Sequence, residues 1–124
     1  MSNLRRGDLV FVENPVQDPN GHILCGNHPA IVISNDSGNY NLSTVVICWL
    51  TSTIKRTDLP TKVVFWQGQY GLKKDSVMDA GQMATIDEEN VEFLLGHLND
   101  QDMERVNQAV LASLGLTPSG REAV

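Results

Sequence analysis

The chain has 124 residues, of which 41% are hydrophobic and 19% are charged, a composition that excludes an intrinsically disordered chain. No apolar run reaches the ~18–20 residues that span a bilayer, and the N-terminal segment has no apolar signal region. We therefore expect a cytoplasmic protein that does not enter a membrane. Its two cysteines, Cys25 and Cys48, are expected to be reduced thiols, one in a loop and one in a buried strand.

The net charge of −6 is distributed unevenly along the chain. Residues 1–85 contain as many basic as acidic residues, so residues 86–124 carry the whole negative charge. Phosphate contacts dominate the affinity of proteins for nucleic acids, which makes an acidic protein a poor general binder of them. Any nucleic-acid site is therefore expected on the first two-thirds of the chain, with the acidic part facing away from it.

Short β-branched or alternating segments predict a series of strands in the first two-thirds of the chain. The predicted strands are residues 9–12, 30–34, 44–50, 61–66, 75–80 and 82–86. Residues 44–50 are apolar enough for a central strand that is buried on both faces. Residues 13–29, rich in Asn, Pro, Asp and Gly, predict a long loop, and residues 35–39 predict a turn. Loops longer than ~12–15 residues in a compact domain usually carry a function or move.

Helical patterns replace the strand patterns near the C-terminus. Residues 87–96 predict a short helical turn, and Asn99 is expected to cap a longer amphipathic helix that ends at Gly115. Residues 117–124 predict a frayed tail. Short strands followed by one amphipathic helix predict an all-β fold with a C-terminal helix, a small barrel formed by one domain over residues 1–116.

Several segments, spread over nearly the whole chain, resemble those of MazF/PemK-type toxins in their order and spacing. They are Arg6-Gly7-Asp8-Leu9-Val10, His28-Pro29-Ala30-Ile31-Val32-Ile33-Ser34-Asn35-Asp36, Leu50-Thr51-Ser52, Leu59-Pro60-Thr61, Lys74-Asp75-Ser76-Val77, Gln82-Met83-Ala84-Thr85-Ile86-Asp87 and Ser113-Leu114-Gly115-Leu116. The resemblance implies an SH3-like, plasmid-maintenance-toxin barrel that is usually a homodimer. It also implies a bacterial endoribonuclease that cleaves single-stranded RNA, such as mRNA, without a metal or other cofactor and is restrained by an antitoxin protein.

The resemblance also assigns positions to the site, and some of them differ from the family pattern. Thr51 matches a strand-end threonine that the family places near the scissile phosphate. His22 belongs to a Gly-His pair that matches the PemK-like branch. His28 stands where the family has an arginine directly before proline, and Ala84 stands where it commonly has another. Asp79 and Gly81 replace an Arg-x-Asp pair of the PemK-like branch.

RNA cleavage without metal needs a base for the 2′-hydroxyl proton, an acid for the leaving 5′-oxygen and a cation for the charge on the phosphoryl oxygens. His22 and His28 are chemically capable of forming the acid–base pair, with Thr51 donating to the phosphate. The alternative is that His22 is a solvated loop residue, His28 a packing residue at a strand edge and Thr51 the cap of a turn.

Three further residues are candidates for RNA binding. Lys55 and Arg56 follow Thr51 closely and would steer phosphates toward it, and Ser52 is its neighbour. The alternative for the two cations is a solvated basic turn. No cluster of His, Cys or Asp has metal-ligand spacing, so no metal site is expected.

Two other functions remain open from the sequence. The absence of both arginine patterns is compatible with a catalytically degenerate member that acts as an RNA-binding or antitoxin-binding module. Toxins that poison gyrase share the same barrel, although the sequence contains nothing specific for that activity.

Overall fold

The computed structural model describes residues 3–16 and 20–116, and the predicted tail at 117–124 lies outside these ranges. One six-stranded sheet, in the order β4-β5-β3-β2-β1-β6, contains only antiparallel neighbours. Its strands are β1 (Asp8–Val12), β2 (His28–Val32), β3 (Thr44–Thr51), β4 (Lys62–Phe65), β5 (Ser76–Asp87) and β6 (Val91–His97). The helices are α1 (Asp36–Asn41) and α2 (Asp100–Ser113), with 3₁₀ turns η1 (Gln69–Gly71) and η2 (Glu88–Asn90).

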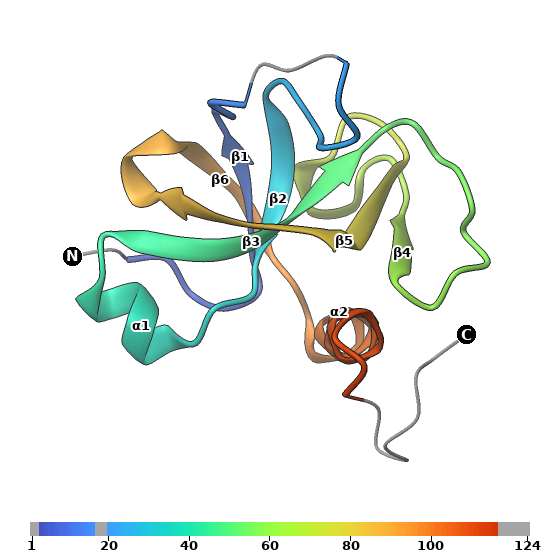
Figure 1. Ribbon diagram of the computed structural model, residues 1–124. Coiled ribbons are helices and arrows are strands. Elements are labelled where there is room, and N and C mark those ends of the chain that lie inside the picture. Colours follow the sequence, from blue (N-terminus) through green and yellow to red (C-terminus); the bar gives the residue numbers. More distant parts are fainter. Residues whose placement is uncertain (1–2, 17–19, 117–124) are drawn as a thin grey trace.

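The sheet curls into a half-barrel, with α2 on one side and the loop between β1 and β2 on the other (Figure 1). This arrangement confirms the predicted all-β fold of the SH3-like type with a C-terminal helix. Within the described part of the chain, neither helix is long and apolar enough to cross a membrane.

Each face of the sheet carries its own apolar layer because side chains alternate along a strand. The layer that includes α2 consists of Leu9, Ile31, Cys48, Leu50, Val63, Phe65, Leu72, Met78, Ala80, Leu98, Val106 and Ala109. The layer on the other face consists of Val10, Val12, Ala30, Val32, Val45, Ile47, Trp49 and Ile86. Since β3 contributes to both layers, the prediction of a central strand buried on both faces is confirmed.

The prediction of two separate short strands at 75–80 and 82–86 is wrong, because one strand, β5, runs continuously over twelve residues. Its pairing with β3 shifts register between Cys48 and Leu50, opposite the part of β5 that contains Gly81. The side chain of Asp79 accepts a hydrogen bond from the backbone N–H of Gly81 (2.8 Å). A local irregularity of this kind bends a strand without ending it.

The helical turn predicted at residues 87–96 is also wrong. Only η2 is helical there, and β6 follows it and pairs with β1. Pairing with β1 satisfies the backbone of β6 and stacks the ring of Phe93 on that of Phe11, which outweighs the helical spacing of the apolar residues.

The ends of the helices follow the predicted capping chemistry. Asn99 caps α2 by accepting the backbone N–H of Asp102 (2.8 Å), as predicted. Gly115, with φ of +70°, follows the helix and confirms the predicted end. The turn predicted at 35–39 is instead the start of α1, because Asn35 caps that helix through the N–H of Gly38 (2.7 Å).

A hydrogen-bonded cluster connects η1 to the start of α2. The hydroxyl of Tyr70 donates to a carboxylate oxygen of Asp102 (2.5 Å) and accepts the backbone N–H of Asn99 (3.2 Å). Arg105 donates to the other carboxylate oxygen of Asp102 (3.0 Å). Burial, followed by the hydrogen bond to Asp102, raises the pKa of Tyr70. The cluster therefore holds the segment before β5 against the helix.

Replacing Tyr70 by Phe is expected to lower the free energy of unfolding by about 1–2 kcal/mol, because Asp102 loses a hydrogen-bond donor. Since the pKa of Tyr70 is raised in the folded state, its stabilising effect is complete below the ordinary tyrosine pKa of ~10 and is lost as the pH rises above it. Urea denaturation from pH 7 to 11 should therefore show a steeper loss for the wild type than for Tyr70→Phe. The exposed Tyr40 supplies the control: Tyr40→Phe should leave the curve unchanged, and an equal effect of both variants would contradict the assignment.

The two cysteines differ in their surroundings, and no disulfide joins them. Cys48 is fully buried, and its burial, with a contribution from Asp79, raises the pKa of its thiol to about 12. Because the thiolate is the reactive form, iodoacetamide is expected to modify the partly exposed Cys25 but not Cys48 in the native protein at pH 8. Peptide mass spectrometry measures both rates; similar native rates would contradict the burial of Cys48, and a sample unfolded in urea supplies the control.

Candidate functional site

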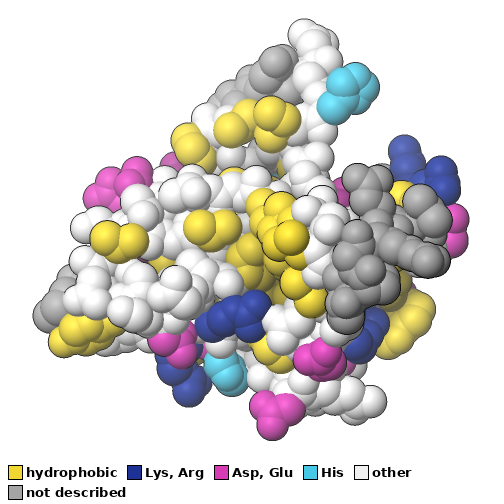
Figure 2. Space-filling model, turned by 60° about the horizontal axis from the view of Figure 1, so that its bottom comes forward, with side chains coloured by type: hydrophobic (Ala, Val, Ile, Leu, Met, Phe, Trp, Pro, Cys, Tyr) yellow, Lys and Arg dark blue, Asp and Glu magenta, His cyan; other side chains and the backbone are white. Residues whose placement is uncertain are grey.

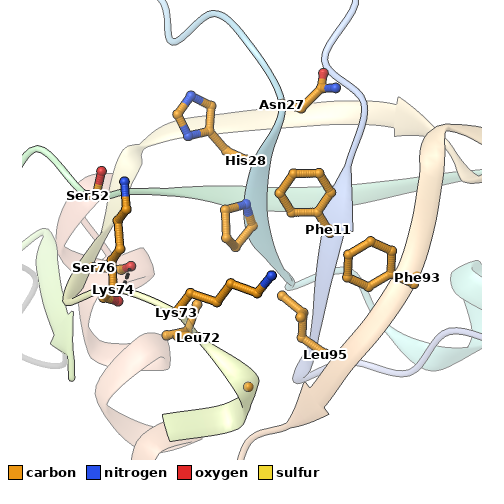
Figure 3. A pocket seen from close by; sticks show the side chains of 12 residues that line it. Phe11, Asn27, His28, Ser52, Leu72, Lys73, Lys74, Ser76, Phe93 and Leu95 are labelled. Carbon is orange, nitrogen blue, oxygen red and sulfur yellow. Dashed lines mark hydrogen bonds between the residues drawn. The ribbon is translucent and has the colours of Figure 1, made fainter. Parts of the chain in front are cut away.

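A cavity of about 480 Å³ opens where the start of β2 faces β6 and the segment that leads into β5 (Figure 3). We call it the first cavity. Its lining residues are Phe11, Asn27, His28, Pro29, Ser52, Gly71, Leu72, Lys73, Lys74, Ser76, Phe93 and Leu95. None of these residues, all within the described ranges, is acidic. The first cavity is therefore a locally cationic site in an acidic protein.

Lys73 and Lys74 give the first cavity its charge. Both are exposed, and within residues 3–16 and 20–116 neither ammonium group forms an ion pair. In Figure 3 Lys74 extends toward Ser52, whereas Lys73 lies across the cavity toward the aromatic rings. Figure 2 shows another view of the surface, in which hydrophobic side chains lie near the centre and Lys, Arg, Asp and Glu side chains are scattered around them. The first cavity itself combines the two lysines with the aromatic rings of Phe11 and Phe93. An anionic ligand with an apolar part suits this combination.

His28 lies at the rim of the first cavity in a defined tautomer. Its Nε2 lies 2.8 Å from the backbone oxygen of Cys25, and because a carbonyl only accepts, Nε2 carries the proton. The ring also meets the buried Trp49 edge-on, at 6.4 Å between centroids and 72° between planes. Nδ1 is consequently the nitrogen of His28 at which a proton can be taken up or released.

A second, smaller cavity of about 140 Å³ contains the other two predicted catalytic residues. It is lined by His22, Leu24, Trp49, Thr51, Asp79 and Gln82. The hydroxyl oxygen of Thr51 accepts the backbone N–H of Thr53 (3.2 Å), so Thr51 caps a turn at the end of β3. Asp79 gives this cavity a carboxylate rather than a cation.

Gln82 ties the long loop to the sheet. Its amide oxygen accepts the backbone N–H of Leu24 (3.2 Å), and its amide nitrogen donates to the backbone oxygen of His22 (3.2 Å). These two bonds imitate the pairing of a neighbouring strand, so one β5 side chain places His22 over the second cavity.

The pairing of β2 with β3 determines how the three predicted catalytic residues lie relative to one another. Ala30 pairs with Trp49, and continuing this antiparallel register by two residues places His28, the first residue of β2, opposite Thr51, the last of β3. His22, His28 and Thr51 therefore surround the same end of this strand pair, but His28 lines the first cavity and the other two line the second.

Of the predicted RNA-binding residues, only Ser52 lines one of these cavities. Lys55 and Arg56 lie in the exposed loop after β3. The guanidinium of Arg56 donates two hydrogen bonds to Asp58 (3.1 and 3.2 Å), and hydrogen bonding to Arg56 is the main cause that lowers the pKa of that carboxyl group. Arg56 therefore already has an anionic partner, whereas Lys55 keeps an exposed side chain.

The sequence analysis missed Lys73, Lys74 and the aromatic pair of Phe11 and Phe93. Two adjacent lysines before a predicted strand are visible in the sequence, but only the fold places them opposite His28. Ala84 packs against the apolar layer that contains Trp49 and does not supply a polar group to either cavity. Among the described residues, no three His, Cys, Asp or Glu side chains gather in a group suited to a metal ion.

Comparison with known proteins places the chain among toxins. Residues 5–114 match the model of the family described as PemK-like, MazF-like toxin of type II toxin–antitoxin system. The chain is 37% identical over 114 residues to a protein named Endoribonuclease MazF from Staphylococcus saprophyticus, which covers 91% of this chain and 92% of that protein.

Two solved structures share the fold at lower sequence identity. The first is MazF (Form-I) from Deinococcus radiodurans, with 23% identity and a TM-score of 0.74, covering 90% of this chain and 96% of that one. The second is an endoribonuclease in complex with its cognate antitoxin from Mycobacterial species, with 23% identity and a TM-score of 0.73, covering 92% and 97%. Together with the family match over most of its length, these similarities show that the chain belongs to the PemK-like, MazF-like toxins of type II toxin–antitoxin systems.

Proposed function

We propose that this protein is an endoribonuclease that cleaves single-stranded RNA, such as mRNA, without a metal ion in the bacterial cytoplasm. Its family and the name of its 37%-identical relative support the activity. A related toxin whose structure contains its cognate antitoxin supports restraint by an antitoxin and, with the family likeness, a homodimer. The observation that carries the proposal is the register of β2 and β3, whose continuation brings His28 and Thr51 to the same end of this strand pair, beside a cavity lined by Lys73 and Lys74. Neither lysine forms an ion pair with another described residue.

The chemistry follows from the groups around this end of β2 and β3. One neutral histidine takes the proton of the 2′-hydroxyl, and the 2′-oxygen attacks the adjacent phosphorus. A protonated histidine gives a proton to the departing 5′-oxygen, so the products are a 2′,3′-cyclic phosphate and a 5′-hydroxyl. We assign these roles to His22 and His28, and Thr51 donates its hydroxyl hydrogen to the phosphate.

In this chain, lysines supply the positive charge that arginines supply in other family members. The cation that stabilises the phosphoryl oxygens must lie beside His28, and Lys73 and Lys74 line the same cavity. Asp79 makes the interior of the second cavity unfavourable for phosphate. The phosphate therefore lies at the end of the β2–β3 pair, between the two cavities, where His28 and Lys74 approach it from the first cavity and Thr51 and His22 from the second. Ser52 contacts the phosphate, whereas Lys55 and Arg56 steer the flanking RNA.

Purified protein in EDTA is expected to cut a long single-stranded RNA at discrete positions, read by primer extension. Because one histidine must be neutral and the other protonated, the rate should be bell-shaped over roughly pH 5.5–8.5, a range that brackets the reference histidine pKa of ~6.5. His28→Ala should lower the rate by about 100-fold or more, since one positioned acid or base contributes 10²–10⁴-fold. Thr51→Ala should lower it by about 100-fold, since the loss of one hydrogen-bond donor to the developing charge costs about 10²–10³-fold.

Thr57→Ala supplies a control in the exposed loop after β3. Cleavage by both His28→Ala and Thr51→Ala at the wild-type rate would reject the residue assignment. Absence of cleavage by the wild type at every pH would favour the degenerate RNA-binding or antitoxin-binding module instead. The remaining alternative, a toxin that poisons gyrase, is tested by a supercoiling assay, in which unchanged gyrase activity in the presence of the protein would exclude it.

Gln82→Ala is expected to slow cleavage by about tenfold without unfolding the protein, because the loop with His22 loses both of its bonds to β5. Hydrogen exchange should report faster exchange at the amide of Leu24 in the same variant. Gln108→Ala, which removes an exposed side-chain contact on α2, should change neither measurement. Normal cleavage by Gln82→Ala, despite fast exchange at Leu24, would show that the position of His22 does not matter for the reaction.

A further inference from the structure

The two ends of the first cavity differ in chemistry (Figure 3). At one end the rings of Phe11 and Phe93 stack nearly parallel, with 9° between planes and 5.3 Å between centroids. At the other end lie Ser52, Lys74 and His28. A nucleotide has the same two parts, a flat apolar base and an anionic phosphate.

The aromatic end exposes ring surface to the cavity. Phe93 is 52% exposed although it stacks on Phe11, so a large apolar side chain on β6 remains open to solvent. Stacking of a base on an aromatic side chain strengthens binding by about tenfold or more and needs only a flat exposed ring. Trp66 is exposed to a similar extent, at 59%, but does not line the first cavity. It therefore offers a matched comparison.

Two hydrogen-bond donors, Lys73 and Asn27, line the first cavity on the side of the aromatic rings (Figure 3). The ammonium of Lys73 can only donate. The amide oxygen of Asn27, at the rim beside Phe11, already accepts the backbone N–H of Asn14 (3.1 Å), which leaves its NH₂ group for a ligand. At one position of the base edge, O4 of uracil and O6 of guanine offer a keto oxygen to such donors, whereas cytosine and adenine have an amino group there, which itself donates.

We infer that the aromatic end of the first cavity is a base-binding subsite that selects a keto base, uracil or guanine, next to the phosphate held by Lys74 and Ser52. The inference deepens and rests on the proposed function, because RNA supplies both the base and the phosphate. An acidic peptide would also satisfy the lysines, but the exposed ring of Phe93, stacked parallel to that of Phe11, favours a flat base.

The test uses the four nucleoside 3′-monophosphates, which contain no cleavable bond, titrated into ¹⁵N-labelled protein and followed by NMR. Uridine and guanosine monophosphates are expected to bind about tenfold more tightly than the cytidine and adenosine compounds, with the largest shifts at the amides of Lys73 and Phe93. Phe93→Leu should weaken all four by about tenfold, whereas Trp66→Leu should change none.

The lysine variants separate base selection from phosphate binding. Lys73→Met should remove the preference for keto bases, whereas Lys74→Met should weaken all four nucleotides equally and keep it. Three results would overturn the subsite: equal binding of the four nucleotides by the wild type, binding unaffected by Phe93→Leu, or shifts confined to residues outside the first cavity. A peptide would then be its occupant.

The RNA cleavage assay is independent of this result: selective nucleotide binding without cleavage rejects only the nuclease, and cleavage without selective binding rejects only the subsite.

Discussion

Three residue pairs, Ala30 with Trp49, Ile31 with Cys48 and Val32 with Ile47, set the register between β2 and β3 near the middle of the sheet. A slip of one residue would exchange the two faces of β2 and move the side chains of one apolar layer into the other. The same register places His28 opposite Thr51. The packing of the core and the geometry of the candidate site therefore depend on one set of strand pairs.

The side chains that β6 contributes help to explain how an acidic protein presents a cationic cavity. Phe93 and Leu95 line the first cavity, whereas the neighbouring Glu92 does not. The C-terminal part thus contributes apolar surface to the site without its acids. The acidic part of the chain, which was expected to face away from a nucleic-acid site, lines the first cavity through Phe93 and Leu95 but through none of its acidic side chains.

Two side chains outside the proposed chemistry hold the segments around the site in place. Gln82 places the loop that contains His22, and the contact of Tyr70 with Asp102 holds the segment before Lys73 against α2. Neither Gln82 nor Tyr70 has the chemistry of a catalyst in this arrangement, since both are engaged in fixed hydrogen bonds. They show that the loop and the lysine segment, which approach the cavity from opposite directions, are each attached to the body of the fold by side-chain contacts.

Local patterns in the sequence predicted the elements whose stability is local or strongly apolar. The apolar run of β3, the Asn99 cap and Gly115 at the end of α2 needed no knowledge of the rest of the chain. β6 was missed because Val91, Leu94 and Leu95 have helical spacing, and only pairing with β1 makes a strand there. β5 was divided in two because Gly81 predicts an interruption, which pairing with β3 reduces to a shift in register.

By itself, the sequence determined the fold class, the family likeness and the candidates His22, His28 and Thr51, because each depends on residue types at fixed spacings. Only the tertiary structure decided that Lys73 and Lys74 share a cavity with His28, and that Phe11 and Phe93 stack beside them. These residues are far apart in the chain, and their proximity results from the curl of the sheet and the pairing of its first and last strands. No local pattern encodes that long-range pairing, which is why the cavity could not be predicted from spacing alone.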